Sequence, residues 1–157
     1  MRPTVLARWV ARSVPGVYGA ARTAGLGRRD AVRVVEASAY ALLLARKRYP
    51  KRWRAENATR HFVWQAWLAA TYGREVAEAV GRAHEKIATD AADSAIDREN
   101  NRIGQAYGVT HAEQIRADAM RPAQSALADE AGRLWDSGQL SPGTSDSTRT
   151  DASGGGT

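Results

Sequence analysis

Apolar residues recur at helical rather than strand spacing along most of the chain. Residues 30–48 predict a helix that Asp30 caps and Pro50 ends. The residues expected on its buried face are Val32, Val35, Ala39 and Leu42 or Leu43. Because strand-like alternation is scarce, we expect an all-α fold, a single compact bundle of about five to seven helices.

The helix predicted to follow Asn57, its expected N-cap, is apolar on almost every side until Gly73. A helix without a polar face belongs at the centre of a bundle. Residues 74–90 predict a helix with one buried stripe, and residues 91–107 predict a further helix that Gly108 ends. The buried stripe consists of Val76, Val80, Ala83 and Ile87.

Two more helices are expected toward the C-terminus. Thr110 and Glu113 have the spacing of a capping box, in which a hydroxyl and a carboxylate bind the first free amides of a helix. Pro122 suits the first position of the last helix. That helix is expected to end near Trp135, with Gly138 just beyond it.

The two ends of the chain differ from the helical domain predicted at residues 29–140. Residues 1–28 form a basic amphipathic segment, in which Trp9 shares an apolar face with its neighbours and Pro15 ends the helix. Residues 141–157 are polar and rich in Ser, Thr and Gly. They cannot bury enough apolar surface to offset the entropy of ordering, so we expect a disordered tail.

The net charge of +6 is unevenly distributed. Residues 1–54 contain 13 Lys and Arg against two acidic residues, whereas residues 55–157 contain 10 against 15. Such a basic block favours an anionic membrane surface or lipid as partner, with the phosphate backbone of nucleic acid as the alternative. It is equally typical of a solvated face. The oligomeric state stays open.

The absence of cysteine excludes disulfides and thiolate metal sites. The candidate cofactor is a divalent cation, which would need histidine, carboxylate, amide or carbonyl ligands. No apolar run approaches the ~20 residues of a membrane span, and Arg8 and Arg12 interrupt any signal-peptide core. We therefore expect a cytoplasmic or peripheral membrane location.

A polar stripe lies along the helix predicted to be most buried. Asn57, His61 and Gln65 follow one another at helical i, i+4 spacing, so they share one face. Buried polar groups need hydrogen-bond partners. A lone buried histidine most often bonds to a backbone carbonyl, and the alternative is a histidine held for acid–base chemistry.

The two helices that follow contain further polar candidates. His84 lies at the edge of its buried stripe, whereas Glu85 points about 100° further round and is expected to contact a neighbouring helix or water. The next helix aligns Asp90, Asp93, Asp97, Asn100, Asn101 and Gly104 along one face. That face suits a hard cation, a substrate hydroxyl or the support of a histidine tautomer, and a solvated acidic face is the alternative. Asp93 and Asp97 are the candidate metal ligands.

Three motifs stand out in this stretch: Asn57-x-x-Arg60-His61, Gly81-x-x-His84-Glu85 and Asp97-x-x-Asn100-Asn101-x-x-Gly104. Together they resemble a family of small bacterial helical domains of unknown function, related to the C-terminal domains of polymorphic toxins and to the prokaryotic Wnt-like superfamily. The resemblance implies an enzyme that acts on membrane lipids or other envelope molecules. It implies as the active-site set His61, His84, Glu85, Asp97, Asn100 and Asn101. A long delivery region precedes such toxins and is lacking in this sequence, so we do not expect a toxin role.

Two functions are compatible with these features. The first is a His-dependent enzyme of hydrolase type, lipase-like or toxin-related, in which His61 or His84 is the general base and Asp97 orients it. The residues expected to contact its substrate are Asn57, Arg60, Glu85, Asn100 and Asn101. The second is a non-catalytic basic helical module that binds nucleic acid or a protein partner through residues 1–54.

Overall fold

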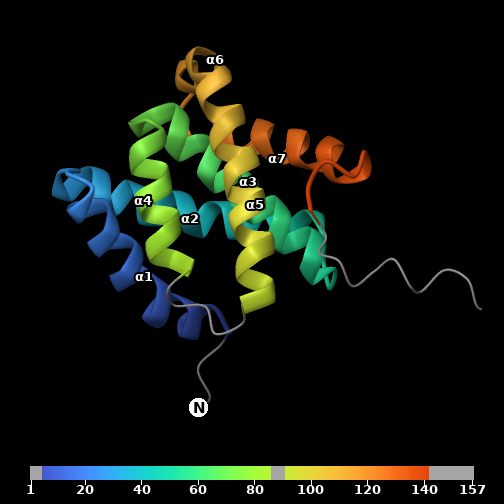
Figure 1. The fold of residues 1–157 in the computed structure, drawn as a ribbon, viewed down its shortest axis with the longest axis horizontal. Coiled ribbons are helices and arrows are strands. Elements are labelled where there is room, and N and C mark those ends of the chain that lie inside the picture. Colours follow the sequence, from blue (N-terminus) through green and yellow to red (C-terminus); the bar gives the residue numbers. More distant parts are fainter. Residues whose placement is uncertain (1–4, 86–90, 142–157) are drawn as a thin grey trace, which may run out of the picture.

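The computed structural model describes residues 5–85 and 91–141, which form seven helices and no strand. The helices are α1 (Val5–Thr23), α2 (Arg28–Arg48), α3 (Trp53–Tyr72), α4 (Arg74–Glu85), α5 (Ala91–Thr110), α6 (Ala112–Ala117) and α7 (Met120–Asp136). The predicted all-α bundle is confirmed (Figure 1). Ile87, Asp90 and the tail predicted after Ser141 lie outside the described residues.

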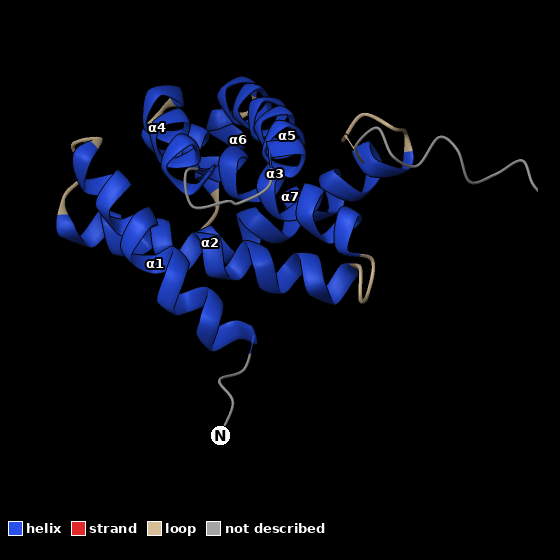
Figure 2. Ribbon diagram, turned by 60° about the horizontal axis from the view of Figure 1, so that its bottom comes forward, coloured by secondary structure: helices blue, strands red, loops and turns tan. Residues whose placement is uncertain are grey.

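The helix α3 lies at the centre of the bundle, as its apolar pattern predicts. Its side chains Phe62, Trp64 and Leu68 are at most 2% exposed. Figure 2 shows α1 and α2 on one side of α3, with α4 and α5 on the other. α7 packs against both α2 and α3. Among the described helices, none is long and apolar enough to cross a bilayer.

The buried face of α2 differs from the predicted one. Val32 and Leu43 are 47% and 51% exposed. Of the predicted residues, Leu42 is buried as expected. The other residues that face the core are Ala31, Val34, Ala37, Ser38, Ala41 and Ala45. The predicted and the observed buried face both have helical periodicity. The observed face is rich in alanine, which lets neighbouring helices approach closely. The Gln124 amide of α7 accordingly reaches the Ala37 carbonyl at 3.2 Å.

The helices α3 and α5 touch backbone to backbone through two glycines of α5. A Cβ on Gly104 would lie 2.7 Å from the Phe62 carbonyl oxygen, and one on Gly108 would overlap the carbonyl of Ala66. The prediction that Gly108 ends the helix is therefore wrong, because α5 continues to Thr110. Glycine is needed there for close packing rather than for termination.

Several predicted helix ends are also wrong. α1 continues through Pro15 to Thr23. α3 begins at Trp53, so Asn57 is not its N-cap. The predicted capping box does not form, because the Thr110 hydroxyl donates to the Ala106 carbonyl within α5. α7 begins at Met120, two residues before Pro122, and the prediction that Gly138 follows the last helix is confirmed.

Candidate functional site

A polar seam joins α3 to α5 along their buried contact. Three hydrogen bonds form it, and in each the two residues are 40 positions apart in the sequence. This constant offset shows that the two helices run parallel and in register. The pairs are Asn57 with Asp97 at 2.5 Å, His61 with Asn101 at 2.8 Å, and Gln65 with Gln105 at 2.8 Å.

The polar seam is shielded from solvent. His61 and Gln65 are fully buried, and Asn101 is 4% exposed. A buried polar group that lacks a partner lowers the stability of the fold by roughly 1–3 kcal/mol. The hydrogen bonds between the two helices therefore explain how the core can contain these polar residues. Gln105, which sequence reasoning did not single out, continues the i, i+4 run of Asp97 and Asn101.

The tautomer of His61 follows from its partners. The Asn101 amide nitrogen donates to Glu85 Oε1 at 3.0 Å, so the amide oxygen of Asn101 faces His61. An oxygen in that position accepts a proton from Nδ1, and neutral His61 therefore has its proton on Nδ1. Its other ring nitrogen, Nε2, therefore has a lone pair that can accept a hydrogen bond.

Two groups of opposite charge face this lone pair of His61. Arg60 Nη2 donates to Nε2 at 2.8 Å, and Asp97 Oδ2 lies 3.3 Å from Nε2. Asn57 connects both groups, because its oxygen accepts from Arg60 at 2.8 Å and its nitrogen donates to Asp97. Nε2 thus has a donor for its neutral form and a carboxylate acceptor for its protonated form.

The ionisation of Asp97 and Arg60 reflects this arrangement. Burial raises the pKa of Asp97, but the hydrogen bond and charge of His61, with Arg60 and Asn57, outweigh it and hold the pKa below its ordinary value. Burial lowers the pKa of the Arg60 guanidinium, and the charges of Asp97 and Glu56 act against that shift. An anionic Asp97 beside a protonated Arg60 is the charge state at neutral pH.

His84 of α4 lies beside His61, with 5.9 Å between the ring centroids, and its ring meets Trp64 edge-on at 5.4 Å. Its Nδ1 atom is buried and has no hydrogen-bond partner within the described part of the chain. Burial, with the charges of Arg60 and His61, lowers the pKa of His84 to about 3. His84 is therefore neutral near pH 7.

Glu85 and Asn100 have different surroundings. Glu85 contacts α5, as expected for a residue facing a neighbouring helix, through its hydrogen bond from Asn101. Asn100 points away from His61 and exchanges two hydrogen bonds with the backbone of Ser141, at 2.9 and 3.2 Å. The structure thus groups His61, Arg60, Asn57, Asp97, Asn101 and Glu85, which we term the His61 network, with His84 at its side.

A metal site is not visible in the described residues, which contain no group of three His, Cys, Asp or Glu side chains placed to hold an ion. Both oxygens of Asp97 are directed at Asn57 and His61. The side chain of Asp93, the second candidate ligand, lies outside the described part of the structure. The side chains of the His61 network suit proton transfer and hydrogen bonding.

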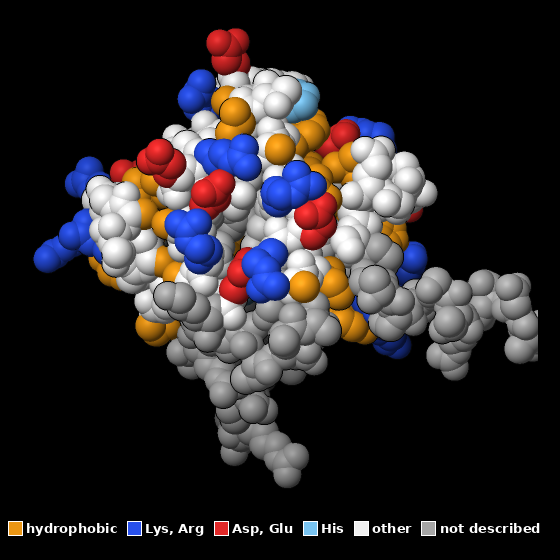
Figure 3. Space-filling view, in the orientation of Figure 1, with side chains coloured by type: hydrophobic (Ala, Val, Ile, Leu, Met, Phe, Trp, Pro, Cys, Tyr) orange, Lys and Arg blue, Asp and Glu red, His pale blue; other side chains and the backbone are white. Residues whose placement is uncertain are grey.

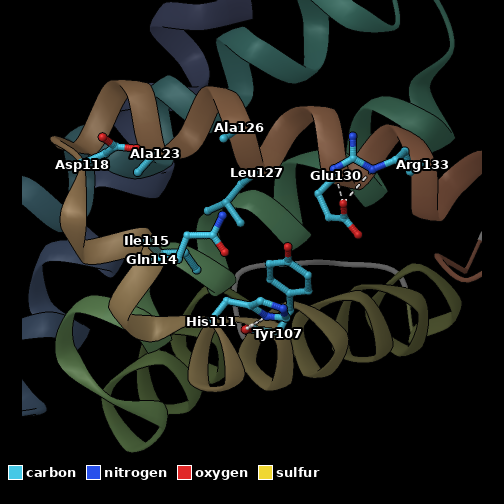
Figure 4. Close-up of a pocket in the computed structure, with 10 residues that line it drawn as sticks. All are labelled: Tyr107, His111, Gln114, Ile115, Asp118, Ala123, Ala126, Leu127, Glu130 and Arg133. Atoms are coloured by element: carbon cyan, nitrogen blue, oxygen red, sulfur yellow. Dashed lines mark hydrogen bonds and ion pairs between the residues drawn. The ribbon is translucent and has the colours of Figure 1, made fainter.

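Two hollows lie near this region. A groove of about 280 Å³ between α4 and α5 reaches Glu85 and Asn101 and thereby borders the His61 network. A separate cavity of about 120 Å³ opens between α5, α6 and α7 (Figure 4). His111 lines that cavity and stacks on Tyr107 at 3.9 Å between ring centroids. No residue of the His61 network lines the second cavity.

Comparison with known proteins gives a family and no function. No curated protein and no solved structure matches the chain. A family model described as a domain of unknown function (DUF6973) matches residues 26–130, about two thirds of the sequence. The matched residues include the whole of α2 to α6 and the complete polar seam. The chain therefore belongs to the DUF6973 family.

Proposed function

We propose that this protein is an enzyme of hydrolase type in which His61 is the general acid–base. The main support is the environment of His61 Nε2, which has a suitable partner in both of its protonation states. A catalytic histidine must gain and lose a proton within one cycle. A purely structural histidine requires only one of those two states.

The proposed cycle begins with neutral His61. A water or substrate hydroxyl that takes the place of the Arg60 N–H donates to the same Nε2 lone pair. It loses its proton to Nε2 as its oxygen forms a bond to the carbonyl carbon or phosphorus of the substrate's ester group. The resulting imidazolium donates from Nε2 to Asp97 Oδ2, which lies 3.3 Å away. It then returns the proton to the oxygen of the leaving alcohol as the ester bond to that oxygen breaks. Asn101, itself fixed by Glu85, keeps the ring oriented throughout.

Arg60 and His84 complete the proposed machinery. Arg60 is released from Nε2 when substrate enters, and its cation then stabilises the negative charge that develops on the reacting group. His84 is neutral and has an unpaired ring nitrogen, so it offers a hydrogen bond to substrate without adding charge. Asn100 has no part in this proposal, because its amide binds the backbone of Ser141.

The proposed substrate class is a lipid or another cell-envelope molecule. The motif resemblance points to that class, and the basic first third of the sequence suits an anionic surface. The alternative of a non-catalytic module that binds nucleic acid does not explain why a buried histidine has both a cation and a carboxylate at one ring nitrogen.

The test is release of fatty acid or headgroup from mixed anionic vesicles by the purified chain. We expect activity in the wild type and a loss of roughly 100-fold or more in His61→Gln, which lacks the acid–base group. His84→Gln should also lose activity, because it lacks the imidazole that is proposed to hydrogen-bond the substrate. His111→Gln is the matched control and should remain active. Unfolding curves accompany each assay. If the first two variants lose only stability, or if the wild type hydrolyses no envelope lipid, the proposal fails.

A further inference from the structure

The groove between α4 and α5 is lined by four arginines. Arg74 and Arg82 come from α4, and Arg98 and Arg102 come from α5. Two carboxylates, Glu78 and Glu85, line the same groove, so its walls have more positive than negative side chains. Figure 3 shows basic and acidic side chains gathered over these two helices. A solvated helix face also contains such charges, so the pairing of each arginine matters.

Two of the four arginines have a carboxylate partner within hydrogen-bond distance. Arg74 donates to Glu78 at 2.8 Å, and Arg102 binds Glu99 through two nitrogens at 2.8 and 3.0 Å. The other two are held loosely. Arg82 lies 3.7 Å from Glu78 and Arg98 lies 3.9 Å from Glu85, and neither has a hydrogen bond to any described residue. Arg82 and Arg98 therefore have guanidinium donors available, one on each wall.

Asn101 and Gly81 also line the groove, and Gln65 lies behind Gly81. The position of the missing Cβ of Gly81 is 3.2 Å from Gln65 Nε2 and 3.4 Å from Asn101 Nδ2. Gln65 is fully buried, and its Nε2 has no acceptor within the described residues. Two side-chain amide nitrogens thus lie close to Gly81. That of Asn101 belongs to the lining of the groove, and that of Gln65 is buried behind it.

We propose that this groove binds a phosphate group, held by Arg82 and Arg98 beside the amide of Asn101. Phosphate has several acceptor oxygens and more than one negative charge, which suits donors on two walls better than a single carboxylate does. Asn101 belongs both to this groove and to the His61 network. The further step, that the phosphate is part of the substrate, rests on the proposed function; phosphate binding itself does not.

Titration of the full chain with inorganic phosphate, followed by calorimetry and by amide NMR shifts, tests the site. We expect saturable binding that falls at least tenfold in the double variant R82Q/R98Q. Arg28→Gln, an exposed arginine at the start of α2, is the matched control and should bind as the wild type does. Equal binding by the double variant and the wild type, or no binding by the wild type at millimolar phosphate, would overturn the proposal.

Two further arms separate free phosphate from a lipid headgroup and separate this site from catalysis. Glycerol phosphate and vesicles of phosphatidylglycerol are compared with vesicles of an uncharged lipid. If the chain prefers the charged vesicles and this preference depends on Arg82 and Arg98, the ligand is a lipid headgroup. If it binds inorganic phosphate and glycerol phosphate equally well and shows no preference for the charged vesicles, the ligand is a small phosphorylated molecule. His61→Gln should bind phosphate normally, so a failure of catalysis and a failure of this site give different results.

Discussion

His61 Nδ1 and Asn101 Oδ1 lie 2.8 Å apart across the contact of two parallel helices, and both side chains are buried. Since the Asn101 amide nitrogen is held by Glu85, this hydrogen bond selects the tautomer of His61 and directs Nε2 at Asp97 and Arg60. The orientation of one ring thus depends on residues from three helices, α3, α4 and α5.

Asn101→Ala should free the His61 ring and leave its Nδ1–H unpaired in the core. We expect a loss of ~1–3 kcal/mol in the free energy of unfolding, measured by urea denaturation. Nitrogen-15 NMR of the His61 ring should show a single tautomer protonated at Nδ1 in the wild type and a mixture in the variant. A wild-type spectrum with the proton on Nε2 would contradict the assigned hydrogen-bond directions.

Asp97→Asn should preserve the shape of the site while removing the acceptor for imidazolium. The amide oxygen that this substitution introduces can still accept from Asn57, but Arg60 loses the carboxylate beside it, so we expect a loss of ~1–3 kcal/mol in the free energy of unfolding. Activity should fall by roughly 10²–10⁴-fold, because the protonated intermediate loses its partner carboxylate. Asp129→Asn, on an exposed ion pair with Arg48, is the control and should leave the rate unchanged.

Gly104→Ala and Gly108→Ala should each push α3 and α5 apart. A Cβ at either position meets the α3 backbone, so we expect a loss of ~1–3 kcal/mol from overpacking. Gly19→Ala is the matched control: its Cβ meets nothing within 4 Å, and it should stabilise α1 by ~0.5–1 kcal/mol. Thermal and urea unfolding measure all three. Neutral effects at positions 104 and 108 would contradict the close contact.

Stability should decrease on mild acidification because of His84. Its ordinary pKa is 6.5 and burial lowers it to about 3 in the folded protein, so between these values the unfolded chain binds a proton that the folded protein excludes. The contribution of neutral His84 to the free energy of unfolding is complete above pH 6.5. It is lost as the pH falls toward 3, at up to ~1.4 kcal/mol per pH unit.

Unfolding curves between pH 4 and 6.5 isolate this effect of His84. The lowered pKa of Asp97 gives a contribution of the same direction, but that contribution is lost only below its ordinary value of 3.8. His84→Gln should therefore show a shallower dependence of the unfolding free energy on pH in this window. An unchanged slope in the variant would show that His84 titrates normally in the folded protein.

Much of the helical architecture was predictable, because helix formation leaves a local pattern. The spacing of apolar residues identified α3 as the central helix, and the i, i+4 spacing placed Asn57, His61 and Gln65 on one face. Helix ends were less predictable. Pro15 and Gly108 have strong local preferences for ending a helix, yet both lie inside one, and at Gly108 the cause is the backbone of a distant segment.

The neighbours Asn100 and Asn101 show what sequence spacing leaves open. Both were expected at the site, but adjacent residues on a helix point about 100° apart. Asn101 faces His61, while Asn100 holds the backbone of Ser141. Likewise, nothing in the motif around His84 indicates that Arg82 and Arg98 line the same groove, since they belong to different helices.

The sequence by itself determined that the chain is helical, that α3 is buried, and that polar residues interrupt its apolar surface in a regular stripe. Only the tertiary structure decided that α3 and α5 run parallel with a 40-residue offset, so that each polar group of the stripe meets a partner. Periodicity fixes which side chains share a face, because it follows from backbone geometry. The identity of the group opposite that face depends on how distant helices pack, which the close approach at Gly104 and Gly108 allows in this bundle.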